Sequence, residues 1–386
     1  MTTYILGGKR TPIGSLLGSL STVPASHLGA AAIKGALEAS GVSGDAVQEA
    51  YMGHVVQAGC GQAPARQAVK FAGLGDHVVA TTVNKVCGSG LQSIILGSYS
   101  IEAGGNDLVV AGGMENMSLA PHLLKASRTG IKFGEGKLLD SMQWDGLWDV
   151  YSDHPMGNCA EECAKEFSFT REAQDEFAIN SYKRSQNSIE SGIFKNEITP
   201  VAISSRRGDV IVENDEEPLK AKFEKIPGLR PAFTKEGTIT AANASTINDG
   251  AAALVLGGEK YKDQAKFKIV AHARHAQHPT WFTTAPVEAM KKNLDIVGLK
   301  LSDIDFFEIN EAFSVVTMAA IKQLDLDPNK VNIYGGAVSL GHPIGCSGTR
   351  IVVTLMNVLE REGAKRGMAS ICIGGGEALS LIIERV

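Results

Sequence analysis

The sequence repeats one order of elements in its two halves, and this repeat constrains the fold more than any other feature of the chain. In the first half, a strand-like run ending at Val83 leads into a glycine-rich turn at 88–90, a helix, a strand and the run Gly-Gly-Met-Glu at 112–115. In the second half, the same order runs from a glycine-rich turn at 345–348 to Gly-Gly-Gly-Glu at 374–377. Two related units that face each other would bring both glycine-rich helix starts to one central site.

Strand-like and helix-like segments alternate along most of the chain. Tyr4–Gly8 is predicted to be a strand, and the alanine-rich segment at 27–40 is predicted to be a helix. This alternation indicates an α/β fold with a largely parallel sheet. Between about residues 118 and 242 the pattern changes, because long polar connections separate two amphipathic helices predicted at 158–167 and 170–190. We interpret this stretch as an insertion between two α/β halves.

The composition excludes several classes of protein. With 386 residues, 44% of them hydrophobic, the chain is long enough to bury a sizeable core. A net charge of −5 gives no reason to expect a nucleic-acid partner. No apolar run approaches the roughly 20 residues of a membrane span, and no basic segment with an apolar core marks a signal peptide. Six scattered cysteines predict free thiols in a cytoplasmic location.

The first glycine-rich turn contains the strongest candidate for a reactive group. The β-branched run at 78–83 predicts a buried strand, and the apolar periodicity after Gly90 predicts a helix. Cys87 should therefore lie at a strand end, just before a helix N-terminus. The free N–H groups and the helix dipole there would lower the pKa of its thiol, as in a nucleophile. The alternative is a buried structural cysteine, which is the usual role of an isolated one.

The second half offers three more candidate groups. His342 lies between glycine and proline, so we expect it to be exposed and able to activate a thiol as a base; it could also be a turn histidine that only satisfies backbone groups. Cys372 precedes three glycines whose N–H groups could hold an oxyanion. Asn310, at a strand-to-helix junction, could cap the helix or orient a water molecule. Two thiols and one imidazole suit acyl transfer followed by carbon–carbon bond chemistry.

A metal site is a weaker candidate. Cys159 and Cys163 are one helical turn apart, and His154 precedes them. Without further ligands at suitable spacing we favour a packed helix face and predict no metal. No phosphate-binding loop or dinucleotide-binding glycine motif follows a strand, which argues against a nucleotide hydrolase and a Rossmann cofactor site.

Four sequence runs, in the same order along the chain, closely resemble the thiolase family. They are Asn84–Gly90, Asn310–Phe313, Gly335–Gly345 and Cys372–Gly376. The resemblance extends over nearly the whole chain. It implies the layered αβαβα thiolase fold, built of two similar halves with a loop domain inserted into the first.

The resemblance also suggests domain boundaries. The N-terminal half would comprise residues 1–117 and be completed by 247–266. The inserted loop domain would comprise residues 118–246, and the C-terminal half residues 267–386.

By this resemblance, five residues have catalytic roles. Cys87 resembles the nucleophile that becomes acylated, His342 the base that activates it, and Cys372 the acid/base that deprotonates the second acyl-CoA at its α-carbon. His342 and a water held by Asn310 resemble the first oxyanion hole. The backbone N–H groups of Cys87 and Gly374 resemble the second, for the acyl-enzyme carbonyl.

Other positions resemble the substrate-binding and assembly segments of the family. Met156 and Phe313 would line the acyl pocket, and Phe233 and Ser245 would contact the pantetheine arm of coenzyme A. The segment Arg128–Asp140 is similar to the loop through which two dimers join as a homotetramer.

The resemblance implies an acyltransferase of lipid metabolism. It would condense two acetyl-CoA to acetoacetyl-CoA and CoA through an acetyl-Cys87 intermediate, and run the reverse thiolysis. The CoA thioesters are substrates, so no cofactor is expected. One alternative is a degradative 3-ketoacyl-CoA thiolase that acts on longer chains. Others are a ketoacyl-synthase-like enzyme using a carrier protein, which Cys372 argues against, and an inactive thiolase-like subunit that serves only in assembly.

Overall fold

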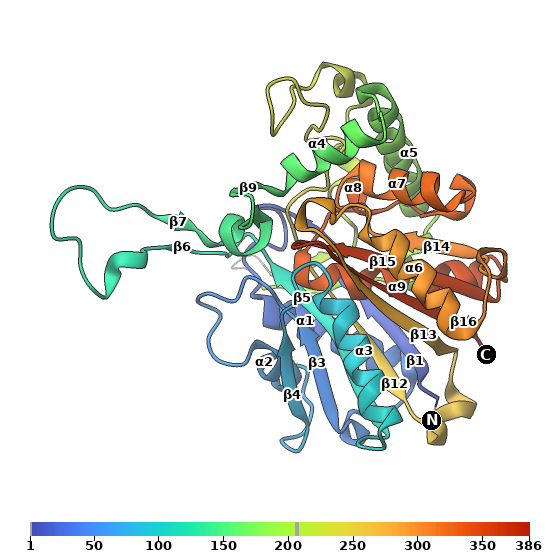
Figure 1. Ribbon diagram of the computed structural model, residues 1–386. Coiled ribbons are helices and arrows are strands. Elements are labelled where there is room, and N and C mark those ends of the chain that lie inside the picture. The colour runs from blue at the N-terminus through green and yellow to red at the C-terminus, as the bar shows by residue number, and fades with distance from the viewer. Residues whose placement is uncertain (1, 205–207) are drawn as a thin grey trace.

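One mixed sheet organises the protein. The computed structural model describes residues 2–204 and 208–386, so Met1 and residues 205–207 of the predicted insertion lie outside the described residues. The strands of the main sheet are β1 (Tyr4–Arg10), β2 (Gly14–Ser15), β3 (Glu49–Gly53), β4 (Val79–Val83), β5 (Leu108–Asn116), β12 (Asn248–Gly257), β13 (Phe267–Ala276), β14 (Phe306–Ile309), β15 (Arg366–Ile373) and β16 (Glu377–Arg385). Their order is β14-β15-β16-β13-β1-β12-β5-β3-β4, and β2 pairs with β12 (Figure 1).

The sheet consists of two similar halves that meet at a narrow junction. There β1 and β13 pair through only two residue pairs, Tyr4 with Lys268 and Ile5 with Phe267. Outward from the junction, β12, β5 and β3 on one side correspond in order and direction to β16, β15 and β14 on the other. The predicted repeat is therefore confirmed, because the two half-sheets have the same order and direction of strands.

The expectation of a largely parallel sheet is wrong. In the main sheet only β3–β4, β3–β5 and β14–β15 are parallel pairs. Parallel neighbours need a crossover connection, such as the helix between β4 and β5. In contrast, β15 and β16 form a hairpin around the turn at 374–376, and β5 returns as β12 after the insertion. The predicted burial of the run at 78–83 is also wrong, because β4 is an edge strand on which Val79 is 58% exposed.

Helices form three layers around the two half-sheets. The helices are α1 (Ala25–Ser40), α2 (Pro64–Phe71), α3 (Ser89–Glu102), α4 (Met156–Glu166), α5 (Arg171–Glu190), α6 (Ala285–Val297), α7 (Ser314–Leu324), α8 (Ala337–Leu340) and α9 (Ile344–Arg361). Side chains alternate along β5, so that Val109 packs with α3 and α9 while Val110 packs with α1 and α2. On the second half, α6 and α7 cover the face opposite the central helices. The predicted αβαβα layering is confirmed (Figure 1).

The two glycine-rich helix starts meet in the central layer. A Cβ added to Gly90 of α3 would lie 2.7 Å from the backbone nitrogen of Thr349 in α9. A Cβ added to Gly348 would lie 2.4 Å from the backbone nitrogen of Leu91. Only glycine permits backbones to approach this closely. The predicted meeting of the two helix starts is therefore confirmed.

The segment between β5 and β12 carries the remaining elements. Its short strands are β6 (His122–Leu123), β7 (Leu139–Asp140), β8 (Trp148–Asp149), β9 (His154–Pro155), β10 (Val201–Ile203) and β11 (Val210–Val212). An arm containing β6 and β7 extends away from the body, whereas α4 and α5 lie above the second half (Figure 1). The buried Arg10 of β1 anchors the segment, since its guanidinium donates to Asp215 at 2.7 and 2.9 Å and to Glu197 at 2.8 Å. The domain boundaries stay a prediction.

The described helices do not include a candidate membrane span. Across residues 2–204 and 208–386, none is both long and apolar enough to cross a bilayer.

Candidate active site

A cavity of about 370 Å³ opens where the two helix starts meet the inserted segment. Each of these three parts of the chain contributes to its walls. The predicted site residues that line it are Cys87, Met156, Phe233, Ser245, Phe313, His342 and Gly374. Cys372 and Asn310 are fully buried just behind the wall, each two residues before a lining residue. The structure thus brings together residues that are far apart in the sequence.

A tight turn presents Cys87 at this cavity. Cys87 lies two residues before the first residue of α3, as predicted. The preceding Val86 has a φ of 47°, a conformation that β-branched residues rarely adopt. Two side chains hold the turn: the Asn84 carboxamide oxygen accepts from the Val86 N–H at 3.1 Å, and Ser89 Oγ donates to the Val86 carbonyl at 2.6 Å. Strained backbone of this kind is concentrated at functional sites.

The expectation of a lowered pKa for Cys87 is wrong. Burial raises the pKa of this thiol to about 11, although the N–H groups of Gly374 and of Cys87 itself act in the opposite direction. Removing the thiolate from water outweighs the favourable hydrogen bonds. Cys87 is therefore a protonated thiol at neutral pH, and it needs a base when it reacts.

His342 supplies a neutral imidazole, but it is not exposed as expected. Its exposed fraction is only 6%, and its backbone N–H donates to Asn248 Oδ1 at 3.0 Å. Burial, followed by the positive charge of Arg350, lowers the pKa of His342 to about 3. Its Nδ1 lies 2.5 Å from Ser347 Oγ, which in turn donates to the Pro343 carbonyl at 3.0 Å. Nδ1 can then donate to Ser347, which leaves a lone pair on the buried Nε2.

Two unpartnered polar atoms at or near the cavity are Nε2 of His342 and Nδ2 of Asn310. Both are buried with no hydrogen-bond partner among the described residues. Buried polar groups are normally paired, because leaving one unpaired costs roughly 1–3 kcal/mol. Two such atoms at one cavity indicate positions that a polar ligand or water occupies.

A buried ion pair fixes the side chain of Asn310. Arg350 of α9 donates from Nη2 to Asn310 Oδ1 at 3.4 Å and from Nη1 to Glu308 Oε2 at 3.4 Å. With its oxygen occupied, the carboxamide directs Nδ2 elsewhere. Of the two sequence-based alternatives, the helix cap is wrong, because α7 begins at Ser314 after Phe313 and has no side-chain cap. No motif in the sequence marked Arg350.

Cys372 is the second thiol of the site. It is the penultimate residue of β15 and is fully buried beside Ala312, Phe313 and Cys163. Burial, and then the negative charge that Cys87 carries as a thiolate, raise the pKa of Cys372 well above its ordinary value. Cys372 packs in one cluster with Met156, Phe233 and Phe313, which line the cavity, so it lies behind that wall.

Glu115 connects the loop after β3 to the start of α9, and the sequence analysis gave it no role. Its buried carboxylate accepts from the N–H groups of Val55 at 3.0 Å, Val56 at 3.1 Å and Gly345 at 2.8 Å. His54 Nε2 lies 3.2 Å from Glu115 Oε1. Burial alone would lower the pKa of His54, but the Glu115 carboxylate raises it to about 9. The repeated glutamate of the two Gly-Gly-x-Glu runs was the available signal.

Several residues that line the cavity had no signal in the sequence. They include Gln143, Leu147, Thr246, Ile247 and Phe282. These side chains come from loops and helix ends whose position depends on the packing of the inserted segment.

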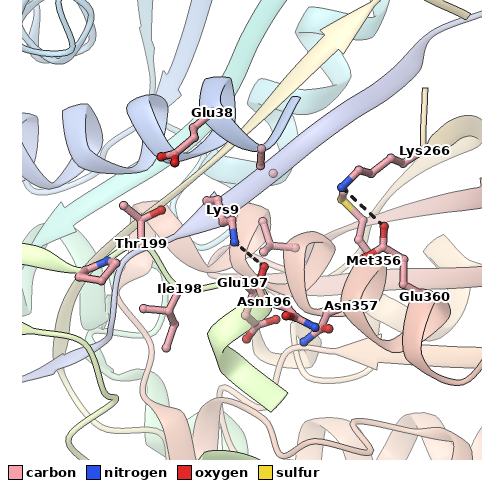
Figure 2. A pocket seen from close by; sticks show the side chains of 15 residues that line it. Lys9, Glu38, Asn196, Glu197, Ile198, Thr199, Lys266, Met356, Asn357 and Glu360 are labelled. Atoms are coloured by element: carbon pink, nitrogen blue, oxygen red, sulfur yellow. Dashed lines mark hydrogen bonds and ion pairs between the residues drawn. The ribbon is translucent and has the colours of Figure 1, made fainter. Parts of the chain in front are cut away.

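A second cavity, of about 460 Å³, lies between α1, α9 and the end of β1. Figure 2 shows its charged side chains, including Lys9, Glu38, Lys266 and Glu360. Lys9 Nζ donates to the Asn196 carbonyl at 2.6 Å, and Lys266 Nζ lies 3.9 Å from Glu360 Oε1. Its lining includes no predicted site residue, and both lysines are already paired. We therefore place the chemistry at the smaller cavity beside Cys87.

Comparison with known proteins gives consistent matches over the whole chain. The family model "Thiolase, N-terminal domain" matches residues 3–260, and "Thiolase, C-terminal domain" matches residues 263–385. The chain is 51% identical to an acetyl-CoA acetyltransferase of Saccharomyces pastorianus over 99% of both proteins. It is 50% identical to the mitochondrial acetyl-CoA acetyltransferase of Rattus norvegicus, over 99% of this chain and 91% of the relative.

Solved structures are similar over the same extent. The Acat5 thiolase of Ascaris suum, in complex with coenzyme A, has a TM-score of 0.95 and 42% identity over 100% of both chains. The acetyl-CoA acetyltransferase of Bacillus anthracis has a TM-score of 0.97 and 39% identity, over 100% of this chain and 99% of that one.

Proposed function

The chain belongs to the thiolase family, and from that premise we propose that it condenses two acetyl-CoA to acetoacetyl-CoA and CoA and catalyses the reverse thiolysis. The observation that carries this proposal is the meeting of Cys87, His342 and Gly374 at one apolar cavity, with Cys372 directly behind it. The enzyme is accordingly an acyltransferase, like the relatives that it matches.

The first half-reaction transfers an acetyl group to Cys87. As the sulfur attacks the thioester carbon, the thiol proton moves to Nε2 of His342, which is neutral and unpartnered. The N–H groups of Cys87 and Gly374, which already reach the sulfur, stabilise the oxyanion. The C–S bond to CoA breaks, and the Cys372 thiol protonates the leaving thiolate. Cys372 is left as a thiolate.

The second half-reaction forms the carbon–carbon bond. The Cys372 thiolate takes a proton from the α-carbon of a second acetyl-CoA, and its raised pKa makes it a stronger base. The enolate oxygen accepts hydrogen bonds from the protonated Nε2 of His342 and from a water on Nδ2 of Asn310, the two unpartnered atoms. The enolate carbon attacks the acetyl group, Cys87 leaves as a thiolate, and His342 returns the proton to it.

The shape and charge of the site support CoA thioesters as substrates. Met156 and Phe313 line the same cavity as Cys87, which supports a short acyl group, and Phe233 and Ser245, proposed to contact the pantetheine arm, line it as well. Thr246 lines both this cavity and a neighbouring one of about 260 Å³. That neighbouring cavity is bordered by Lys220, Lys222 and Lys225. We place the CoA phosphates beside these three lysines, with the substrates acting without a further cofactor.

The arm between β6 and β7 supports a homotetramer. It projects from the body, and its Phe133 is 99% exposed and Leu138 66% exposed (Figure 1). Exposed apolar side chains on a projecting segment are typical of a contact with another chain. The cytoplasmic location stays a prediction, and relatives of this chain include mitochondrial proteins.

A chain-length series tests the proposed function. The purified enzyme would be assayed for acetyl-CoA condensation and for thiolysis of 3-ketoacyl-CoA substrates of increasing length. We expect measurable condensation, and thiolysis that is fastest with acetoacetyl-CoA and falls as the chain grows past Met156 and Phe313. Faster thiolysis of the longer substrates would favour the degradative alternative, and the absence of both reactions would favour an inactive subunit.

A further inference from the structure

Three side chains of metal-ligand type meet beside the catalytic cavity. Asp149, His154 and Cys159 each present one ligand atom within 4.8 Å of the other two. Asp149 and His154 lie opposite each other in the β8–β9 pair, and Cys159 is in the first turn of α4. Cys159 Sγ lies 3.8 Å from Asp149 Oδ2. Asp149 and Cys159 are buried, whereas His154 is partly exposed and gives access from solvent.

We propose that Asp149, His154 and Cys159 form a binding site for one divalent cation of the zinc class. A thiolate, an imidazole and a carboxylate are the three ligand types that zinc uses in proteins, and water can complete a tetrahedron. The binding step is balanced: the Cys159 sulfur bonds the metal and its thiol proton passes to solvent. Zinc is intermediate between hard and soft cations. Ligands that include a nitrogen and a sulfur therefore favour it over magnesium or calcium, which prefer oxygen.

The contacts around the cluster orient the ligands. His154 Nδ1 lies 3.2 Å from the Pro155 carbonyl and can donate to it, which leaves the lone pair on Nε2. Metal-bound histidines generally make such a contact through their other nitrogen. Asp149 Oδ1 accepts from the Tyr151 N–H at 3.3 Å, so the carboxylate is fixed through one oxygen while Oδ2 faces Cys159.

The cluster differs from the pair that the sequence suggested. Spacing alone pairs Cys159 with Cys163, but Cys163 Sγ lies 3.9 Å from the Val315 carbonyl in the hydrophobic layer under α7. Asp149, ten residues before Cys159, takes its place. The expectation of no metal rested on the absence of a further ligand near Cys159, and the β8–β9 pairing supplies one.

The position of the cluster gives a bound ion a direct connection to the catalytic cavity. Pro155 and Met156 lie between His154 and Cys159 in the sequence, and both line that cavity. An ion bound to His154 and Cys159 would fix both ends of this short segment. Cation binding should therefore restrict the wall that contacts the acyl group.

Cobalt substitution tests the site with a spectroscopic readout. Full-length protein carrying Cys87→Ala and Cys372→Ala, which removes the two catalytic thiols, would be titrated with Co²⁺. We expect one ion per chain, with a sulfur-to-cobalt charge-transfer band and tetrahedral visible bands that Zn²⁺ abolishes. Adding Cys159→Ser should remove the charge-transfer band, and the matched control Cys163→Ser should retain it. No band in the parent, a band that survives Cys159→Ser, or equal loss with Cys163→Ser would overturn the proposal.

Thermal unfolding provides a second test that does not depend on a buried substitution. Because His154 is partly exposed, His154→Ala should fold normally. Zinc should raise the unfolding temperature of the parent and of Cys163→Ser, and it should leave that of His154→Ala unchanged. The same zinc-induced shift in His154→Ala would contradict the assignment of this ligand.

Discussion

The two glycine-rich helix starts occupy matching places in the fold, yet they supply opposite kinds of chemical group. The start of α3 presents a protonated thiol, Cys87, and the start of α9 follows a neutral imidazole, His342. The carboxylate of Glu115 accepts from the Gly345 N–H at the start of α9, and the guanidinium of Arg350, further along the same helix, donates to Asn310. The duplicated architecture provides two matching positions, and burial is the main cause of the protonation state at each: it raises the pKa of the Cys87 thiol and lowers the pKa of His342.

The surroundings of Glu115 and of Arg350 also differ in how their polar atoms are paired. Glu115 is satisfied by three backbone N–H groups and His54. On the other side, Arg350 binds the oxygen of Asn310 and leaves Nδ2 unpartnered, as is Nε2 of His342. The Glu115 carboxylate therefore has a structural role, whereas the unpartnered nitrogens of His342 and Asn310 are open positions for a substrate oxygen. Four variants or measurements can break or sharpen this comparison.

The largest effect should come from replacing Cys87, one of the two cysteines at the helix starts, with alanine. Cys87→Ala should reduce thiolysis of acetoacetyl-CoA at least about a thousandfold, because it removes the nucleophile. The control Cys346→Ala removes the fully buried thiol at the start of α9 and should keep most activity, at a stability cost of about 1 kcal/mol. Comparable losses in both variants would show that the two starts are not chemically distinct.

Removing the charge behind the second helix start should have the next largest effect. Arg350→Met frees the Asn310 carboxamide and removes the charge that helps keep the pKa of His342 low, so kcat should fall about a hundredfold. The variant also leaves Glu308 unpaired, which destabilises the fold.

The double variant Arg350→Met/Glu308→Gln separates these two consequences. It should recover thermal stability without recovering kcat, as measured by calorimetry and by the condensation assay. Recovery of kcat together with stability would mean that Arg350 has only a structural role.

A methyl group between the two helix starts should cost less. In Gly90→Ala the new Cβ would meet the Thr349 backbone, which cannot move without shifting α9. We expect a loss of about 1–3 kcal/mol in the free energy of unfolding by urea denaturation. The control Gly44→Ala, whose Cβ would have its nearest neighbour at 3.6 Å, should change that free energy little. An unchanged free energy of unfolding in Gly90→Ala would show that the fold does not require the close approach of the α3 and α9 backbones.

The smallest effect concerns the pH dependence of the first helix start. Cys87 is alkylated in its thiolate form and not as a thiol, and the pKa of this thiol is raised to about 11. Below that pKa the thiolate fraction increases tenfold per pH unit, so the rate of Cys87 alkylation should rise about tenfold from pH 7 to 8 and again from pH 8 to 9. Peptide mass analysis would assign the label to Cys87. A rate that levels off near neutral pH would restore the lowered pKa expected from the sequence.

The sequence predicted the positions of the site better than its electrostatics. The glycine-rich turns identified Cys87, His342 and Cys372 because backbone geometry of that kind has a local signature. The predicted pKa of Cys87 and the predicted exposure of His342 were wrong because distant segments bury both residues: Cys87 packs against the cluster that contains Ile344, and His342 bonds Asn248. Glu115 bonds Gly345 in the other half of the chain, and Arg350 bonds Asn310, which lies 40 residues before it, so no local pattern records either contact.

The fold shows the same division. The repeat predicted two similar halves and their meeting point, because it preserves the order of elements. It did not predict strand direction, since a hairpin such as β15–β16 and a crossover unit leave similar hydrophobic runs in the sequence. The cluster of Asp149, His154 and Cys159 was missed because a short strand pairing joins Asp149 to His154, and spacing along α4 favoured Cys163 instead.

The most direct test of the different roles of the two thiols is to locate the acetyl group. The enzyme and its Cys372→Ala variant would be incubated with acetyl-CoA, quenched, digested and analysed by mass spectrometry. We predict acetyl-Cys87 in both, with the variant accumulating this intermediate and producing no acetoacetyl-CoA. Acetylation of Cys372 in the unsubstituted enzyme, or a Cys372→Ala variant that condenses normally, would contradict the account.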